Sequence, residues 1–135
     1  NGGSGGDAFI LNHNVTIEDV TGIIGAGGGG GGGVRIPTSP AKTTGGGGGA
    51  GIVAGTPGAT RSSGGAGVSL TFGEYEIVGG DGGGINEPGS VGTEDTTGVP
   101  PAILYSGGLP GIAINTNGYN LIIENGNSNI LGDIL

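Results

Sequence analysis

Apolar and polar residues alternate along the first strand-like segment of the chain, residues 8–17. Successive side chains of an extended strand point to opposite faces, so every second residue shares a face. One face of this segment would carry Phe9, Leu11, His13, Val15 and Ile17. The alternation predicts a β-strand near the start of the chain, with His13 packed on its apolar face or at the rim of that face.

A second alternating segment lies in the middle of the chain, at residues 68–77. Leu70 and Phe72 would share one face, and the alternation resumes one position out of phase after Gly73. An extra residue in a strand produces such a shift, and glycine suits that position. The pattern therefore predicts a strand with a β-bulge at Gly73.

The third alternating segment, residues 118–126, lies near the other end of the chain. One of its faces would carry Tyr119, Leu121 and Ile123. The dipeptide Asn125-Gly126 is typical of a two-residue hairpin turn, because both residue types tolerate positive φ. We therefore expect a hairpin that leads into residues 127–135, and short β modules at both ends of the chain.

Glycine dominates the sequence between these modules. Thirty-nine of the 135 residues are glycine, against a usual share of about 7 %. Runs of glycine, the longest at residues 27–33, alternate with inserts rich in Pro, Thr, Ser and charged side chains, at residues 34–44, 56–63 and 86–106. Such a composition often indicates a flexible linker. The slightly positive mean hydropathy of +0.11 and the clustered strand-like segments instead favour an ordered fold.

An unbroken glycine run can be ordered as a helix of the polyproline II type. This helix makes no internal hydrogen bonds, so its N–H and C=O groups point sideways and can bond to neighbouring segments. A helix surrounded on all sides needs glycine at nearly every position, because a Cβ would hold its neighbours apart. Each lateral hydrogen bond contributes only about 1 kcal/mol net, whereas ordering one residue costs about 1–2 kcal/mol. We therefore expect apolar ends to close the bundle, with contributions from Phe9, Leu11, Leu121 and Ile123.

The predicted fold class is all-β to irregular, with a bundle of polyglycine II helices, short β-strands at both chain ends and essentially no α-helix. Residues 1–7 are expected to be a linker, and residues 8–135 the glycine-rich domain. Within that domain we expect strands leading into the first glycine run, then the runs with their inserted loops, and last a closing β module, at residues 8–21, 22–111 and 112–135.

The charge of the chain narrows the classes of partner. Its formal net charge is −8, from eleven acidic residues against Arg35, Lys42 and Arg61. A nucleic-acid backbone would be repelled, so nucleic acid is excluded as a partner. The absence of cysteine excludes disulfides, thiolate metal sites and cysteine nucleophiles. No apolar stretch approaches the ~20 residues that cross a bilayer.

Catalytic and cofactor chemistry finds little support in the residues. His13 is the only histidine, so a zinc site with two histidines is impossible. Glu74 and Glu76 share a strand face without the surroundings of a sugar-cleaving cleft. The glycine runs match nucleotide-binding patterns trivially, and no helix signal follows them. Asp81 and the pairs Glu18-Asp19 and Glu94-Asp95 could bind calcium incidentally. We expect no enzyme activity, no cofactor and no dedicated metal site.

Several short motifs occur in an order that resembles a known family. Asn14-Val-Thr-Ile17 and Gly22-Ile-Ile-Gly-Ala26 precede the first glycine run, and the far end holds Gly107-Gly-Leu-Pro-Gly-Ile-Ala-Ile114, Asn117-Gly-Tyr119, Asn125-Gly126 and Gly132-Asp-Ile134. Together with the glycine runs and their inserts, this arrangement resembles the glycine-rich tip domains of tailed-bacteriophage fibres and receptor-binding adhesins, such as the T-even-type fibre-tip adhesins. The similarity covers nearly the whole chain after residue 7.

The resemblance implies a layered sandwich of polyglycine II helices whose loops bind a receptor on the bacterial surface without catalysis. The receptor would be an outer-membrane protein or a glycan such as lipopolysaccharide. The protein would lie in the virion at the tail-fibre tip, together with other tail-fibre or virion chains, as a homo-oligomer such as a trimer or attached to a fibre trimer. The receptor-binding residues implied by position are Arg35, Ile36, Pro37, Lys42, Thr60, Arg61, Glu87, Glu94, Asp95 and Tyr105.

Two other functions fit the composition. A self-assembling extracellular filament or structural subunit could use strand-like termini for chain-to-chain strand exchange. A glycine-rich antifreeze-type protein could use similar helices, but it would present a flat face of Thr and Ala in place of irregular, proline-bearing inserts. The localisation would then be extracellular.

Overall fold

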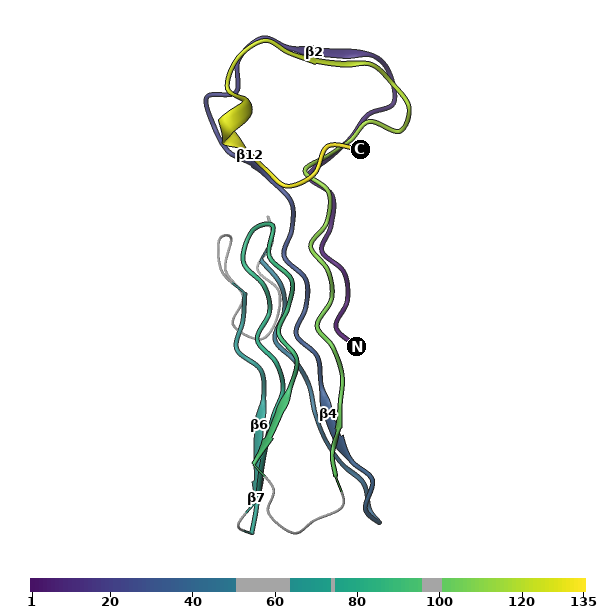
Figure 1. Ribbon diagram of the computed structural model, residues 1–135, viewed down its shortest axis with the longest axis vertical. Coiled ribbons are helices and arrows are strands. Elements are labelled where there is room, and N and C mark those ends of the chain that lie inside the picture. Colours follow the sequence, from purple (N-terminus) through teal and green to yellow (C-terminus); the bar gives the residue numbers. More distant parts are fainter. Residues whose placement is uncertain (51–63, 74, 96–100) are drawn as a thin grey trace.

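The computed structural model describes residues 1–50, 64–73, 75–95 and 101–135. The molecule is elongated and has three parts along its length (Figure 1). A ring built from residues 9–25 and 112–135 forms one end, named the cap here. Extended glycine-rich segments form the middle, named the glycine bundle. The described residues of 34–44, 68–78 and 93–104 form the other end, named the distal end.

The predicted fold class is confirmed as mostly β and irregular. The described residues contain short strands, no α-helix and one 3-10 helix, η1 (Asn127–Asn129). Over these residues no helix is long and apolar enough to span a membrane. Much of the chain is extended without belonging to a sheet, because glycine segments bond to neighbours in several directions and not in one plane.

Residues 27–33 form the centre of the glycine bundle. The N–H groups of residues 27–32 donate to backbone carbonyls 2.8–3.0 Å away, and these acceptors are, in order, the carbonyls of Gly6, Ala50, Glu87, Gly3, Gly47 and Ser90. Carbonyls of the same run accept hydrogen bonds from two further segments, through the N–H groups of Gly111, Gly108, Tyr105, Gly83 and Gly80. Five segments therefore surround the run, and each donor direction recurs at every third residue.

This three-residue period explains why two of every three positions in the central run have no room for a side chain. Gly28, Gly29, Gly31 and Gly32 are buried, and a Cβ on any of them would lie 1.7–2.1 Å from a backbone oxygen of a neighbouring segment. Real Cβ atoms essentially never approach that closely, so a side chain would push the segments apart. Gly27, Gly30 and Gly33 lie on the remaining side and are only half-buried.

The first residues of the chain, expected to be a linker, are bonded into the bundle. Gly2, Gly5 and Ala8 donate backbone hydrogen bonds to the carbonyls of Ser106, Leu109 and Ile112, while the carbonyls of Gly3 and Gly6 accept from the central run. The Oδ1 atom of Asp7 accepts a hydrogen bond from the N–H of Ile112, 2.9 Å away. The N-terminal glycines thus act as a bundle segment, which the short, Ser-containing sequence did not indicate.

The cap consists of two stacked coils from opposite ends of the chain. The first coil holds β1 (Phe9–Ile10), β2 (Val15–Ile17) and β3 (Ile24–Gly25), and the second holds β10 (Ile114–Asn115), β11 (Leu121–Ile123) and β12 (Ile130–Leu131). Each strand pairs in parallel with its counterpart: β1 with β10, β2 with β11 and β3 with β12. In Figure 1 the two coils overlie each other around the ring.

Apolar side chains fill the interior of the cap. Leu11, Ala26, Ala113 and Ile114 are buried there, and partly buried residues pack against them: Val15, Ile17, Ile24, Leu121, Ile123 and Ile130. The predicted closing roles of Leu11, Leu121 and Ile123 are therefore confirmed, whereas that of Phe9 was wrong, since its side chain is 53 % exposed.

Two sequence predictions for the cap were wrong. The first alternating segment is broken between β1 and β2, and His13 is exposed in the break beside Asn12. Residues 121–131 do not form a hairpin, because Gly126, with a φ of 84°, turns the chain into η1 and on to the next side of the ring. Both errors arise because the ring bends the chain sharply where a flat strand was expected.

The distal end is built from two antiparallel sheets. In one, β4 (Val34–Ile36) lies between β5 (Lys42–Thr44) and β9 (Ile103–Leu104); in the other, β7 (Tyr75–Val78) lies between β6 (Ser69–Phe72) and β8 (Thr93–Asp95). Gly73, with a φ of 62°, lies in the turn between β6 and β7, so the predicted bulge is a hairpin turn. A second apolar cluster of Val34, Ile36 and Ile77, with Leu70, Phe72 and Ala102 against it, lies between the sheets.

Candidate functional site

The distal end brings together segments from three parts of the sequence. The turn between β4 and β5, the hairpin of β6 and β7, and the ends of β8 and β9 all lie at the end of the molecule away from the cap (Figure 1). The bundle behind them consists largely of glycine and so has fewer side chains to present. The distal end therefore carries a large share of the side chains that could recognise another molecule.

A basic residue lies on the outer face of the first distal sheet. Arg35 on the central strand β4 is flanked in register by Thr43 on β5 and Ile103 on β9, and all three are exposed. Lys42 is exposed at the start of β5, and Pro37 is exposed in the adjoining turn. Arg35 and Ile103 combine positive charge with an apolar side chain on this face, and Ile103 is 42 % exposed. Lys42 is opposite the buried Ile36 in register, so it belongs to the other face of the sheet.

An acidic pair lies on the outer face of the second distal sheet. Glu76 on β7 and Asp95 on β8 are directly opposite each other in register, and both are exposed. The hydroxyl of Ser69 donates a hydrogen bond to Oε1 of Glu76. Opposed like charges on a sheet surface disfavour pairing, so this pair does not stabilise the fold. The two distal sheets therefore differ in charge.

Several of the sequence-predicted residues are placed differently. Ile36 is fully buried in the distal apolar cluster and cannot contact a receptor while the domain is folded. The carboxylate of Glu94 accepts a hydrogen bond from the N–H of Ala102, 2.8 Å away, and is therefore engaged within the domain. Tyr105 is half-buried, and its N–H donates to Gly33. Thr60 and Arg61 lie outside the described residues.

Glu87 lies at the opposite end of the bundle from Arg35. It follows a turn next to the cap, where the N–H of Asn86 donates to the carbonyl of Ala26. The Glu87 carboxylate accepts a hydrogen bond from the N–H of Gly84 in the same turn. The insert at residues 86–106 is therefore divided between the two ends of the bundle, and the sequence alone did not indicate this.

Sequence reasoning missed the aromatic residues of the β6–β7 hairpin as part of this end. Phe72 and Tyr75 flank its turn, with ring centroids 5.8 Å apart. Both are half-buried and lie next to the exposed Gly73. The signal available was Gly73 itself, since a phase shift at a glycine fits a tight turn as well as a bulge.

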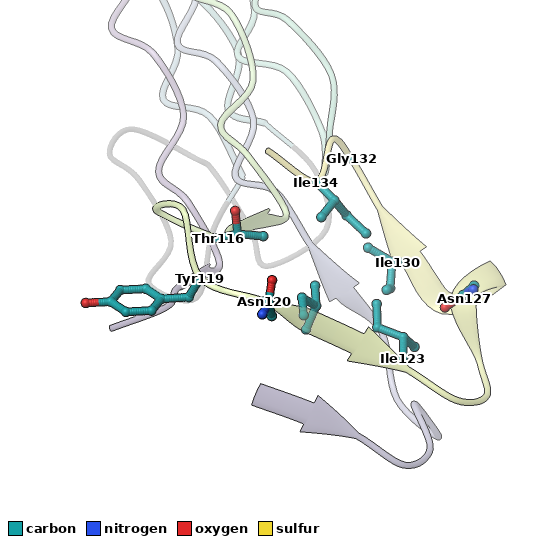
Figure 2. Close-up of a pocket in the computed structure, with 9 residues that line it drawn as sticks. Thr116, Tyr119, Asn120, Ile123, Asn127, Ile130, Gly132 and Ile134 are labelled. Atoms are coloured by element: carbon teal, nitrogen blue, oxygen red, sulfur yellow. The ribbon is translucent and has the colours of Figure 1, made fainter. Parts of the chain in front are cut away.

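A second candidate site lies in the cap. The interior of the second coil opens to an exposed pocket of about 620 Å³. Figure 2 shows its lining of apolar side chains, among them Ile123, Ile130 and Ile134, with Tyr119 and Asn120 at one side. No sequence prediction included this pocket, because it is created when the two ends of the chain stack.

Metal binding is not indicated over the part of the chain that the structure describes. No three His, Cys, Asp or Glu side chains within it gather in an arrangement able to hold a metal ion. The Oδ1 atom of Asp81 instead accepts a hydrogen bond from the N–H of Gly67, 2.9 Å away. This contact gives Asp81, the acidic residue of the glycine-rich segment 79–84, a structural role.

Comparison with known protein families gives a match over the whole chain. The family model described as phage tail fibre adhesin Gp38 matches residues 1–135. No curated protein and no solved structure matches the chain.

Proposed function

Because this chain belongs to the Gp38 family of phage tail fibre adhesins, we propose that it attaches the virus particle to a bacterial surface receptor through its distal end. The family makes it a component of the virion and of the tail fibre. A position at the tip of the fibre, with the distal end directed to the host, fits the elongated shape and the location of the exposed hairpins (Figure 1).

The gathering of the hairpins at one end is the observation that carries this proposal. The bundle needs glycine where its segments meet, so it can vary little there without losing its packing. The hairpins extend beyond the bundle and have no such restriction. We interpret the bundle as polyglycine II helices, an interpretation supported by the lateral hydrogen bonds that recur every third residue. Such a scaffold would hold variable loops in fixed positions.

The charges of the distal end suggest the chemistry of the receptor. Arg35 and Lys42 would pair with lipopolysaccharide phosphates or with acidic loops of an outer-membrane protein, and Arg is well suited to both phosphate and carboxylate. Glu76 and Asp95 on the other sheet would face basic groups. Complementary charges of this kind mainly raise the association rate and the specificity. Binding would be non-catalytic, consistent with an adhesin.

The proposal is tested by exchanging the turn residues 37–41 for those of a relative that attaches to a different host. We expect the host range to follow the exchanged turn, and the charge reversals Arg35→Glu and Lys42→Glu to lower adsorption. An exchange of residues 85–88, at the opposite end of the bundle, is the matched control. The proposal would be refuted if the exchange of residues 37–41 and the charge reversals left adsorption unchanged while the exchange of residues 85–88 altered it.

A further inference from the structure

The outer edge of the second cap coil has unpaired backbone groups. Strand β11 pairs with β2 on one side only, and the described residues place no strand on its other side. On the paired side, the carbonyl of Asn120 and the N–H of Glu124 bond to β2. A parallel strand turns alternate residues to its partner. The N–H and C=O groups of Leu121 and Ile123 therefore point to the open edge, which is a template for a further strand.

The interior of the coil is also uncovered on this side. The pocket of about 620 Å³ is lined by the side chains of Leu121, Ile123, Ile130 and Ile134 (Figure 2). Ile114, which lies between the two neighbouring layers, is only 1 % exposed, whereas Ile134 is 44 % exposed. The open pocket thus has the composition of a coil interior but lacks the layer that would cover it.

The second coil repeats features by which the first coil holds it. The side-chain Oδ1 of Asn14 in the first coil accepts a hydrogen bond from the N–H of Asn120 in the second, 2.9 Å away. Asn120 occupies the equivalent position one coil further on, and it lines the pocket. The chain itself begins a third layer at one corner, where Ile134 pairs in parallel with Ile114. The uncovered side of the second coil therefore presents the same kinds of groups by which the first coil binds the second.

The charge of the cap indicates what kind of chain continues the stack. The cap, residues 9–25 and 112–135, contains four acidic residues and no Lys or Arg; the acids are Glu18, Asp19, Glu124 and Asp133. A second copy of the cap would bring the same negative charge and would be repelled. A different polypeptide, with a neutral or basic rim, would not.

We propose that the open edge of the second coil is the attachment surface of this domain, and that it binds an extended, apolar coil with a neutral or basic rim from a partner chain of the tail fibre. Parallel strand pairing with Leu121 and Ile123 gives the register, and side chains of the partner fill the pocket. The inference rests on the proposed function, since it assigns the cap to the fibre and leaves the distal end for the receptor.

The test measures binding to tail fibres purified from virus particles that lack the adhesin. Ile134→Glu places a charge in the open pocket, and because Ile134 is already 44 % exposed we expect the variant to fold. Its fibre binding should fall by about tenfold or more. The matched control is Ile10→Glu on the first coil, where the side chain is 65 % exposed, and its fibre binding should not change. Asn120→Ala, which removes the exposed acceptor, should weaken fibre binding by a smaller factor and serves if Ile134→Glu misfolds.

The remaining results distinguish this proposal from its alternatives. Unchanged fibre binding by both Ile134→Glu and Asn120→Ala would overturn it, and so would a loss of binding in Ile10→Glu alone. Self-association of the wild-type chain that Ile134→Glu abolishes would assign the surface to a second copy instead. Adsorption of the isolated Ile134→Glu chain to bacteria should remain normal, whereas the exchange of residues 37–41 and the charge reversals at Arg35 and Lys42 should change adsorption to the original host and leave fibre binding intact. The two proposals can therefore fail separately.

Discussion

The cap and the distal end close the same glycine bundle in different ways. In the cap, strands from opposite ends of the chain pair in parallel, as when Val15 lies beside Leu121. At the distal end most pairs are local and antiparallel, as when Phe72 lies beside Tyr75. The cap therefore orders both chain ends together, whereas a distal hairpin can change length or sequence without altering the path of the rest of the chain.

The two apolar clusters have corresponding roles. The cap cluster includes Leu11 and Ile114, and the distal cluster includes Ile36 and Ile77. Burying one such side chain stabilises a protein by about 1.5–3 kcal/mol, whereas the glycine bundle between the clusters has almost no side chains to bury. Stabilisation by apolar burial is therefore concentrated in the cap and the distal end, while the bundle holds these two ends at a fixed separation.

The largest expected effect comes from breaking the bundle that joins the two ends. In Gly31→Ala the new Cβ would lie 1.8 Å from the carbonyl oxygen of Gly80, so the segments would have to separate. We expect a loss of more than about 4 kcal/mol, measured by thermal or denaturant unfolding. In Gly30→Ala the nearest atom is 3.3 Å away, and in Gly6→Ala no atom lies within 4 Å.

Gly6→Ala is the matched control, because a glycine replaced without strain gives a small gain of about 0.4–1 kcal/mol. Gly30→Ala should fall between the two other variants. Equal unfolding temperatures for Gly31→Ala and Gly6→Ala would contradict the close packing of the central run.

Removal of residues 1–7 should give the next largest effect. The deletion removes the donors Gly2 and Gly5, the acceptors Gly3 and Gly6, and the carboxylate of Asp7 that bonds to the backbone beside β10. At about 1 kcal/mol net for each hydrogen bond, we expect a loss of about 3–5 kcal/mol in denaturant unfolding. A true linker could be removed without cost, so an unchanged midpoint would restore the linker interpretation. Ser4→Ala, at an exposed position, is the control.

Matched truncations in the two apolar clusters test whether the two ends are stabilised independently. Ile114→Ala in the cap and Ile77→Ala at the distal end each remove a fully buried side chain, and each should cost about 2–5 kcal/mol. The difference should appear in amide hydrogen exchange. Ile114→Ala should speed exchange in both coils, because they share one interior, whereas Ile77→Ala should speed exchange mainly in residues 68–78 and 34–44. The same exchange pattern in both variants would show that the ends are not independent.

The general architecture could be predicted from the sequence because glycine leaves few alternatives. A run such as residues 27–33 has no side chains to bury, so order requires lateral backbone bonds, and the structure has them at every third residue. The apolar alternation likewise located the strand segments around Leu11 and Leu121. The basic residues Arg35 and Lys42, predicted from their insert, lie exposed at the distal end.

The remaining features depend on which segments meet in space. The alternation around Leu70 is equally compatible with a bulge and with a hairpin, and only the packing of Ile77 against Ile36 decides between them. Ile36 was expected at the surface because the family resemblance implies receptor-facing inserts, yet it is buried in the distal apolar cluster. The cap pocket needs the stacking of residues 9–25 with residues 114–131, a parallel pairing across nearly the whole chain that no local pattern encodes.

The smallest expected effect compares one turn at each end. Gly73 in the distal hairpin has a φ of 62° and Gly118 in the cap a φ of 83°, and an added Cβ would meet no atom within 4 Å at either position. Alanine there costs only the left-handed backbone conformation, about 1 kcal/mol, so Gly73→Ala and Gly118→Ala should lower stability equally in denaturant unfolding. Their functions should differ, because adsorption to bacteria should fall only in Gly73→Ala, where strain in the turn displaces Phe72 and Tyr75. Equal adsorption by the two variants would argue that the β6–β7 hairpin does not contact the receptor, and would restrict binding to the sheet that carries Arg35.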